Sequence, residues 1–235
     1  MDTVDIPKYT LDEMQGLRQY NAWMAEKIRP YLGRRVLELG SGIGNFSDYF
    51  LDRDFLMVTD ITDEYLKILQ EKYADRKNVS VSRYCLGGGS GYDSFKQFEF
   101  DTILCSNVLE HIRDDQQALE EMYQMFSGEG NLILLVPALT FLYGSLDKNL
   151  GHYRRYDKED LVKKVEGAGF QVRAAFYFNF FGALGWLVHS RILKLDFIPR
   201  RTFKSAEKMI PLFKFLEGKI RVVMGQSLVV VGNKK

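Results

Sequence analysis

The chain has few of the features that mark several common classes of protein. Only two cysteines, Cys85 and Cys105, occur among 235 residues, and they fit no disulfide framework or metal-binding spacing. A reducing compartment, the cytoplasm, is therefore expected. The first residues are acidic and lack an apolar stretch, so no signal peptide is predicted. No run approaches about 18 uncharged apolar residues, which excludes a helix that spans a bilayer.

Signatures of several catalytic and binding classes are also absent. No Gly-x-Ser-x-Gly nucleophile motif occurs. The three histidines, His111, His152 and His189, are scattered, and no pair of ligand residues shares one element with metal-binding spacing. No metal site is therefore predicted. The basic residues come without an RNA-binding motif, so nucleic acid is not an expected partner.

The charge is distributed unevenly along an otherwise ordinary globular composition. Hydrophobic residues make up 46% of the chain and charged residues 27%. Residues 1–147 hold 14 Lys and Arg against 24 Asp and Glu, whereas residues 148–235 hold 18 against 7. The basic part either faces an anionic partner or is attracted by the acidic part within the fold, and both readings stay open.

Apolar runs typical of buried strands alternate with helical patterns. Strands are expected near 34–39, 55–60, 79–82, 100–107, 131–137, 170–178 and 227–232. Helices are expected over 9–32, 44–52, 62–74, 113–126 and 157–167. This alternation predicts an α/β fold built on a doubly wound, mostly parallel sheet.

The first expected strand leads into a turn with glycine on alternate positions. Glu38 is followed by Gly40, Gly42 and Gly44, which let the backbone turn sharply and approach a ligand closely. The helix expected after this turn would point unpaired N–H groups at that ligand. Asp60 ends the second strand, where its carboxylate would accept hydrogen bonds from a ribose or cap the helix that follows.

The Glu-x-Gly-x-Gly-x-Gly pattern resembles the cofactor site of class I S-adenosylmethionine (SAM)-dependent methyltransferases, and the element order is similar over nearly the whole chain. The resemblance implies seven strands, the last antiparallel between the fifth and sixth. It also implies SAM as cofactor, S-adenosylhomocysteine as product, and Glu38 near the cationic groups of SAM. A dinucleotide site has its third glycine one residue later, so an NAD-dependent oxidoreductase is the alternative. The implied cofactor residues are Glu38, Gly40, Ser41, Gly42, Gly44, Asp60, Ile61, Leu86, Asn107 and Val108.

Two further segments are expected to complete the cofactor site. Residues 107–112, Asn-Val-Leu-Glu-His-Ile, resemble the segment that passes the methionine part of SAM, and Asn107 would bind its amino group. His111 in this segment is interpreted as a packing residue rather than an acid or base. The family often has an acid after the third strand that meets adenine, whereas this chain has Leu86 and a run of glycines. Backbone atoms near Leu86 and stacking on Ile61 would then recognise the ring.

The loop after the fifth expected strand carries the candidate catalytic residues His152, Tyr153 and Arg154. A similar His-Tyr-Arg-Arg-Tyr segment is familiar in class I enzymes that act on sugars, quinones and lipids. His152 would take the proton of an acceptor hydroxyl, because an imidazole titrates near neutral pH. Arg154 or Arg155 would hold an acceptor phosphate or carboxylate. The alternative is a loop pinned to the fold by Arg–carboxylate pairs.

Four parts are expected along the chain. They are an N-terminal helical cap (1–33), a SAM-binding core (34–178), an apolar and basic helical insertion (179–226) and a last strand (227–235). The insertion fits an acceptor lid, a peripheral contact with anionic lipid through 180–221, extra helices packed on the sheet, or an oligomer interface.

The sequence therefore predicts a SAM-dependent methyltransferase that acts on a small, anionic or lipid-linked acceptor, with oxygen as the favoured acceptor atom. A non-catalytic SAM-binding or membrane-docking module is the second alternative.

Overall fold

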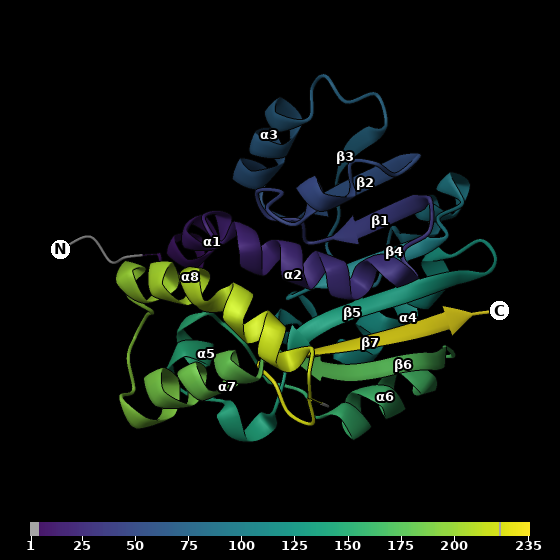
Figure 1. Ribbon diagram of the computed structural model, residues 1–235. Coiled ribbons are helices and arrows are strands. Elements are labelled where there is room, and N and C mark those ends of the chain that lie inside the picture. The colour runs from purple at the N-terminus through teal and green to yellow at the C-terminus, as the bar shows by residue number, and fades with distance from the viewer. Residues whose placement is uncertain (1–4, 221) are drawn as a thin grey trace.

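A single seven-stranded sheet with helices on both faces organises the chain (Figure 1). The computed structural model describes residues 5–220 and 222–235. The strands are β1 (Arg35–Leu39), β2 (Phe55–Asp60), β3 (Val79–Arg83), β4 (Thr102–Ser106), β5 (Gly130–Pro137), β6 (Gln171–Phe178) and β7 (Ser227–Lys234). Their spatial order is β3-β2-β1-β4-β5-β7-β6, and only β7 runs antiparallel to its neighbours. The predicted doubly wound, mostly parallel fold is confirmed.

Two apolar layers bury the sheet because alternate side chains of its central strands point to opposite faces. The helices are α1 (Ile6–Gln15), α2 (Arg18–Ile28), α3 (Asp63–Lys72), α4 (Asp115–Met125), α5 (Ser145–Asn149), α6 (Lys158–Gly167), α7 (Phe180–Trp186) and α8 (Arg200–Glu217). One core cluster joins the sheet to α4 and α6, and the other joins it to α2, α3 and α8. Figure 1 shows α1, α2 and α8 together on the face toward the viewer.

Two expected helices differ from the structure. The helix expected over 9–32 is two helices, α1 and α2, because the backbone leaves the helical conformation at Leu17, with φ −88° and ψ 64°. The helix expected over 44–52 is absent. Gly44 has a left-handed φ of 77°, which an α-helix cannot continue, and only a short 3₁₀ turn, Ser47–Phe50, follows. The glycine turn therefore lacks the helix N-terminus that the sequence predicts directly after it.

The insertion lies against the N-terminal helices through opposite charges. Arg200 of α8 pairs with Glu13 of α1 at 3.1 Å, and Lys214 of α8 pairs with Glu26 of α2. These contacts support the reading in which the basic part of the chain is attracted by the acidic part. The rest of the insertion is α7 and a π-helical segment, Leu187–Ile192. Nowhere in the described residues is a helix both long and apolar enough to cross a membrane.

Gly225, which precedes β7, lies directly against the backbone of β6. A Cβ atom at this position would lie 2.1 Å from the carbonyl oxygen of Phe178. We expect Gly225→Ala to lower the free energy of unfolding by about 3 kcal/mol, because the backbone of a paired strand cannot move away from the new Cβ without a large energetic cost. Urea denaturation measures this loss. Gly185→Ala, where a Cβ meets nothing within 4 Å, is the matched control and should leave stability unchanged or slightly higher. Equal effects of both changes would contradict the prediction.

Candidate active site

A cavity of about 320 Å³ lies at the carboxyl ends of β1, β4 and β5. Ligands of doubly wound sheets bind at this edge, outside the ends of the parallel strands. Helix α1 covers the cavity and contributes Leu11 and Met14, a role that the sequence alone does not indicate. Trp186, from α7 of the insertion, also lines the cavity. The core sheet, the N-terminal helices and the insertion thus all contribute to one cavity.

The glycine turn after β1 is held in shape by Asp60. Gly40, Gly42 and Gly44 all have left-handed φ angles, of 69°, 55° and 77°. One carboxylate oxygen of Asp60 accepts the N–H of Gly42 and the other accepts the N–H of Thr62, each at 2.9 Å. Asp60 therefore ties the turn to the start of α3, and its contact with a ribose stays a prediction.

The structure separates the predicted cofactor residues into two groups. Those that line the cavity are Glu38, Gly40, Ser41, Gly42 and Asn107. Those that do not are Gly44, Asp60, Ile61, Leu86 and Val108. Gly44 faces α3, Leu86 packs against the apolar core, and Ile61 is 52% exposed. Val108 fills the space beside Gly40, where a Cβ would lie 2.4 Å from one of its methyl groups.

Glu38 brings a buried carboxyl group to the cavity. Its side chain accepts a hydrogen bond from Ser47 and is 3% exposed. Burial raises the pKa of Glu38 to about 7, although the hydroxyl groups of Ser47 and Ser41 oppose the shift. A cationic ligand in the cavity would favour the ionised form of this carboxyl group.

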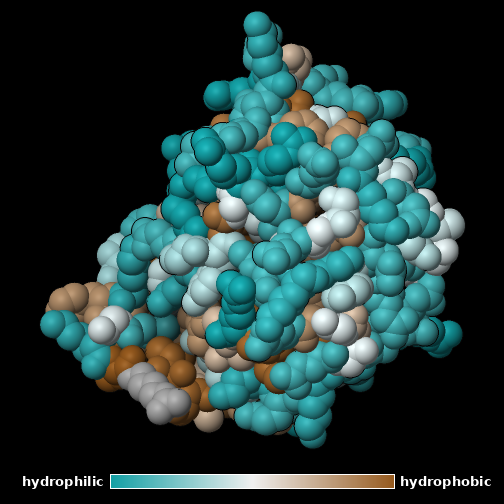
Figure 2. Space-filling view, turned by 90° about the vertical axis from the view of Figure 1, so that its right-hand side faces the viewer, coloured by the Kyte–Doolittle hydropathy of each residue, from teal (hydrophilic) through white to brown (hydrophobic). Residues whose placement is uncertain are grey.

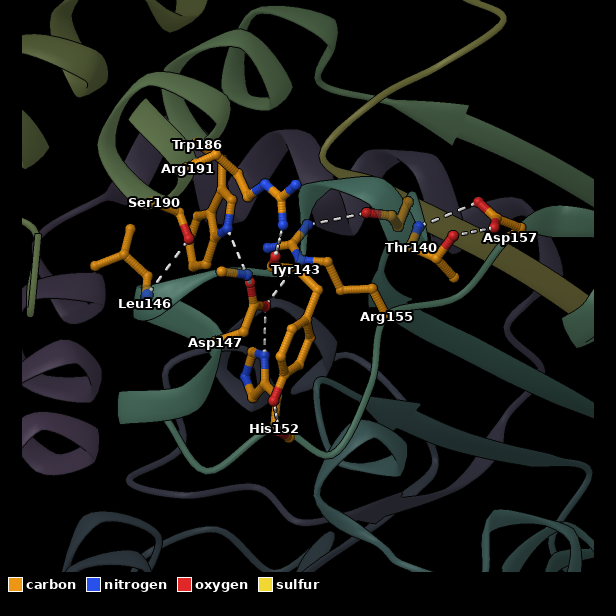
Figure 3. Close-up of polar contacts among 12 residues, drawn as sticks. Thr140, Tyr143, Leu146, Asp147, His152, Arg155, Asp157, Trp186, Ser190 and Arg191 are labelled. Atoms are coloured by element: carbon orange, nitrogen blue, oxygen red, sulfur yellow. Dashed lines mark hydrogen bonds and ion pairs between the residues drawn. The ribbon is translucent and has the colours of Figure 1, made fainter. Parts of the chain in front are cut away.

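His152 is held toward the cavity by Asp147 of α5 (Figure 3). One oxygen of Asp147 lies 2.9 Å from Nδ1 of His152 and accepts from Nε of Arg155 at 2.7 Å. Its other oxygen accepts from the Gly144 N–H at 3.0 Å and from Nε1 of Trp186 at 3.1 Å. Burial alone would raise the pKa of Asp147, but His152 and Arg155 hold it below its usual value. An ionised Asp147 can only accept, so Nδ1 of His152 carries the hydrogen, and in the neutral imidazole Nε2 keeps its lone pair.

Of the predicted catalytic residues, only His152 lines the cavity. Tyr153 is 54% exposed and lies outside the lining. Arg154 pairs with Asp115 at 2.7 Å, away from the cavity, as in the alternative of a pinned loop. Arg155 is the arginine at the cavity: it is buried, its guanidinium lies 4.5 Å from the ring centre of Trp186, and its Nη2 has no partner.

Glu110 and His111 meet His152 from the other side. They form a turn after β4, and the backbone N–H of Tyr153 donates to the carbonyl of Glu110 at 2.8 Å, which joins this turn to the His152 loop. Both carboxylate oxygens of Glu110 are buried without a partner. Burial raises the pKa of Glu110 to about 7, while His152 and Arg155 oppose the shift. The His111 and His152 rings meet edge to face at 4.7 Å.

The strand order, the glycine turn and the cavity at the carboxyl ends of β1 and β4 together define the class: a Rossmann-like methyltransferase fold. Residues 37–132 match a family model described as a methyltransferase domain. The structure of a SAM-dependent methyltransferase from Archaeoglobus fulgidus has the same fold, with a TM-score of 0.58 at 19% identity over 92% of this chain and 94% of that chain.

Two curated relatives match part of the chain. UbiE from Serratia proteamaculans, a ubiquinone/menaquinone biosynthesis C-methyltransferase, is 30% identical over 107 residues, 44% of this chain and 42% of that protein. Probable polyketide synthase 42 from Dictyostelium discoideum is 25% identical over 141 residues, 50% of this chain and 5% of that protein. The matched segment of this chain covers less than half the length of either relative. The predicted resemblance to methyltransferases is confirmed for residues 37–132, which match a methyltransferase domain.

Proposed function

We propose that this chain transfers the methyl group of SAM to an oxygen atom of a small acceptor that reaches His152. The observation that carries the proposal is the His152–Asp147 pair, which faces the same cavity as the glycine turn. SAM would lie between that turn and Asn107, with its cationic groups near Glu38. The acceptor would enter beside Trp186 and Arg155, whose unpartnered Nη2 suits an anionic group.

The chemistry is an in-line displacement at the methyl carbon. The acceptor oxygen forms the new C–O bond, the S–C bond breaks, and its electron pair returns to sulfur, which gives neutral S-adenosylhomocysteine. The acceptor proton passes to Nε2 of His152. Because the sulfonium is already a good leaving group, the protein contributes alignment and the exclusion of water more than acid catalysis.

Two measurements test this function. Calorimetric titration should give binding of S-adenosylhomocysteine and none of NADH, and labelled SAM should then label an acceptor pool. Chemical analysis of the product distinguishes an O-methyl from a C-methyl group. A carbon acceptor is the second candidate, because the Serratia relative is named a C-methyltransferase. Binding of NADH in place of S-adenosylhomocysteine would overturn the proposal, and cofactor binding without transfer to any acceptor would favour a non-catalytic module.

A change in protonation of Glu38 should accompany cofactor binding. Its pKa is raised to about 7 by burial, so near pH 6.5 much of the population is protonated, and the ammonium and sulfonium groups of SAM would expel that proton. We expect the release of a fraction of one proton, measured by calorimetry in buffers of different ionisation enthalpy. Glu38→Gln should abolish the release. Between about pH 4.5 and 7 the unfolded chain loses the Glu38 proton before the folded chain does, so the parent should lose stability over this window as the pH rises, and the variant should lose less.

We also propose that the acceptor is lipid-linked and that the stretch 180–221 makes a peripheral contact with a membrane. Large apolar side chains of α8 and its C-terminal end are exposed, including Leu212 (47%), Phe215 (61%) and Ile220 (57%). A hydrophobic area lies at the lower left of the mostly hydrophilic face in Figure 2. Lys208 and Lys219 are exposed as well, which suits an anionic lipid surface. Arg221 of this stretch lies outside the described residues.

Vesicle sedimentation tests the membrane contact. The chain should sediment with phosphatidylglycerol-containing vesicles, less with pure phosphatidylcholine, and less again at high salt, because exposed charges are screened. Phe215→Ser should weaken binding by about tenfold, since it removes one large apolar side chain from the contact. Ile68→Ser, an exposed apolar position on α3, is the matched control. Equal binding to both vesicle types, or equal loss in both variants, would contradict the proposal.

A further inference from the structure

Three metal-ligating side chains converge in the active-site cavity. One ligand atom from each of Glu110, His111 and His152 lies within 4.8 Å of the others, and all three residues line the cavity. Two ligands of a tetrahedral zinc ion lie about 3.4 Å apart, so small side-chain rotations would close this set around a cation. The sequence does not reveal these three residues as one site, because 40 residues separate His152 from His111 and His152 comes from a different loop.

Two independent features of these side chains point to a ligand. Both oxygens of the fully buried Glu110 carboxyl lack a hydrogen-bond partner, which is costly unless something else satisfies them. His152 has its Nδ1 fixed by Asp147, so its Nε2 lone pair is free. A carboxylate that orients a histidine in this way is the usual outer partner of a metal-binding imidazole.

We propose that Glu110, His111 and His152 bind a divalent transition-metal cation, with Asp147 as the residue that positions His152. Two imidazole nitrogens and one carboxylate suit zinc and its first-row neighbours better than magnesium or calcium, which prefer oxygen ligands. Three protein ligands leave at least one coordination position, and it faces the cavity.

This site rests on the proposed function and adds to it a cation that binds the acceptor hydroxyl. An acceptor hydroxyl bound at the open position would lose its proton to water, because a divalent cation lowers the pKa of a coordinated oxygen. The resulting oxyanion attacks the SAM methyl carbon, and the S–C electron pair stays on sulfur. In the metal-bound state His152 is a ligand, and the cation performs the deprotonation assigned to its Nε2 in the metal-free state.

Metal titration of the untagged chain, after chelation and dialysis, tests the site directly. Zn²⁺ measured by competition with a chromogenic chelator should bind at one equivalent, and Co²⁺ should give a visible spectrum of nitrogen and oxygen ligands. Glu110→Gln and His111→Gln should each weaken Zn²⁺ binding by more than about 100-fold, and Asp147→Asn by about 10–100-fold. His189→Gln, the remaining histidine, should bind Zn²⁺ normally because it bonds the Gly185 carbonyl in the insertion.

The outcomes separate this proposal from the function on which it builds. Circular dichroism identifies any variant that does not fold, and the near-isosteric Glu110→Gln keeps the test valid if a histidine variant fails. Absence of stoichiometric Zn²⁺ binding, unchanged affinity in Glu110→Gln, or an equal loss in His189→Gln would overturn the metal site. S-adenosylhomocysteine binding to the metal-free chain should persist. Its absence beside intact Zn²⁺ binding would instead count against the methyltransferase function.

Discussion

Replacement of His152 by glutamine is expected to lower kcat for methyl transfer by about 10²–10⁴-fold. His152 is the only predicted catalytic residue that lines the cavity, and Asp147 fixes its orientation. The loss follows whether Nε2 takes the acceptor proton or binds a cation, because glutamine has neither a basic nitrogen nor the same reach. Transfer from labelled SAM at saturation measures kcat, and titration with S-adenosylhomocysteine should give an affinity within about threefold of the parent.

Two further variants sharpen the interpretation of that loss. Asp147→Asn should lower kcat less than His152→Gln does, since it permits the wrong imidazole tautomer but keeps the ring. His189→Gln should keep the parental kcat, because this histidine lies in the insertion and bonds the Gly185 carbonyl. Full activity in His152→Gln, or an equal loss in His189→Gln, would remove His152 from the mechanism.

The sheet could be predicted because its strands are local patterns. Apolar runs such as those of β1, β2 and β5 stand out from the amphipathic helices between them, and each was expected within a residue or two of its observed bounds. The glycine turn shows where a secondary-structure prediction from local sequence is wrong. A run of small residues before an apolar pattern suits a helix start, whereas three left-handed glycines on alternate positions break the helix before it begins.

The active site could be predicted only where one segment contains the whole arrangement. His152 follows Asp147 of α5 by only five residues, so their pairing is within reach of sequence reasoning. Trp186 bonds Asp147 from 39 residues away, and the Glu110 carbonyl accepts from the backbone N–H of Tyr153, which is 43 residues further along the chain. Such contacts depend on how elements pack, which periodicity does not report. The sequence left open for the same reason whether Arg154 or Arg155 faces the acceptor, since neighbouring residues point to opposite sides.

A methyl group at Gly40 is expected to weaken cofactor binding by about 100-fold. The φ of 69° at this position costs a side chain about 1–2 kcal/mol, and the new Cβ would lie 2.4 Å from Val108. Overlap of this size costs about 1–3 kcal/mol more, and the turn can avoid it only by moving into the cavity. Titration of Gly40→Ala with S-adenosylhomocysteine measures the loss of affinity.

The double variant Gly40→Ala/Val108→Ala separates the two causes of that loss. Val108→Ala removes the methyl group that the new Cβ would meet, so it should restore the part of the affinity lost to overlap and leave the part lost to the left-handed φ. Val108→Ala alone should bind the cofactor almost normally, because Val108 does not line the cavity. An affinity of Gly40→Ala within about threefold of the parent would mean that the cofactor does not approach this turn, since a ligand packed on the Gly40 backbone cannot tolerate its displacement.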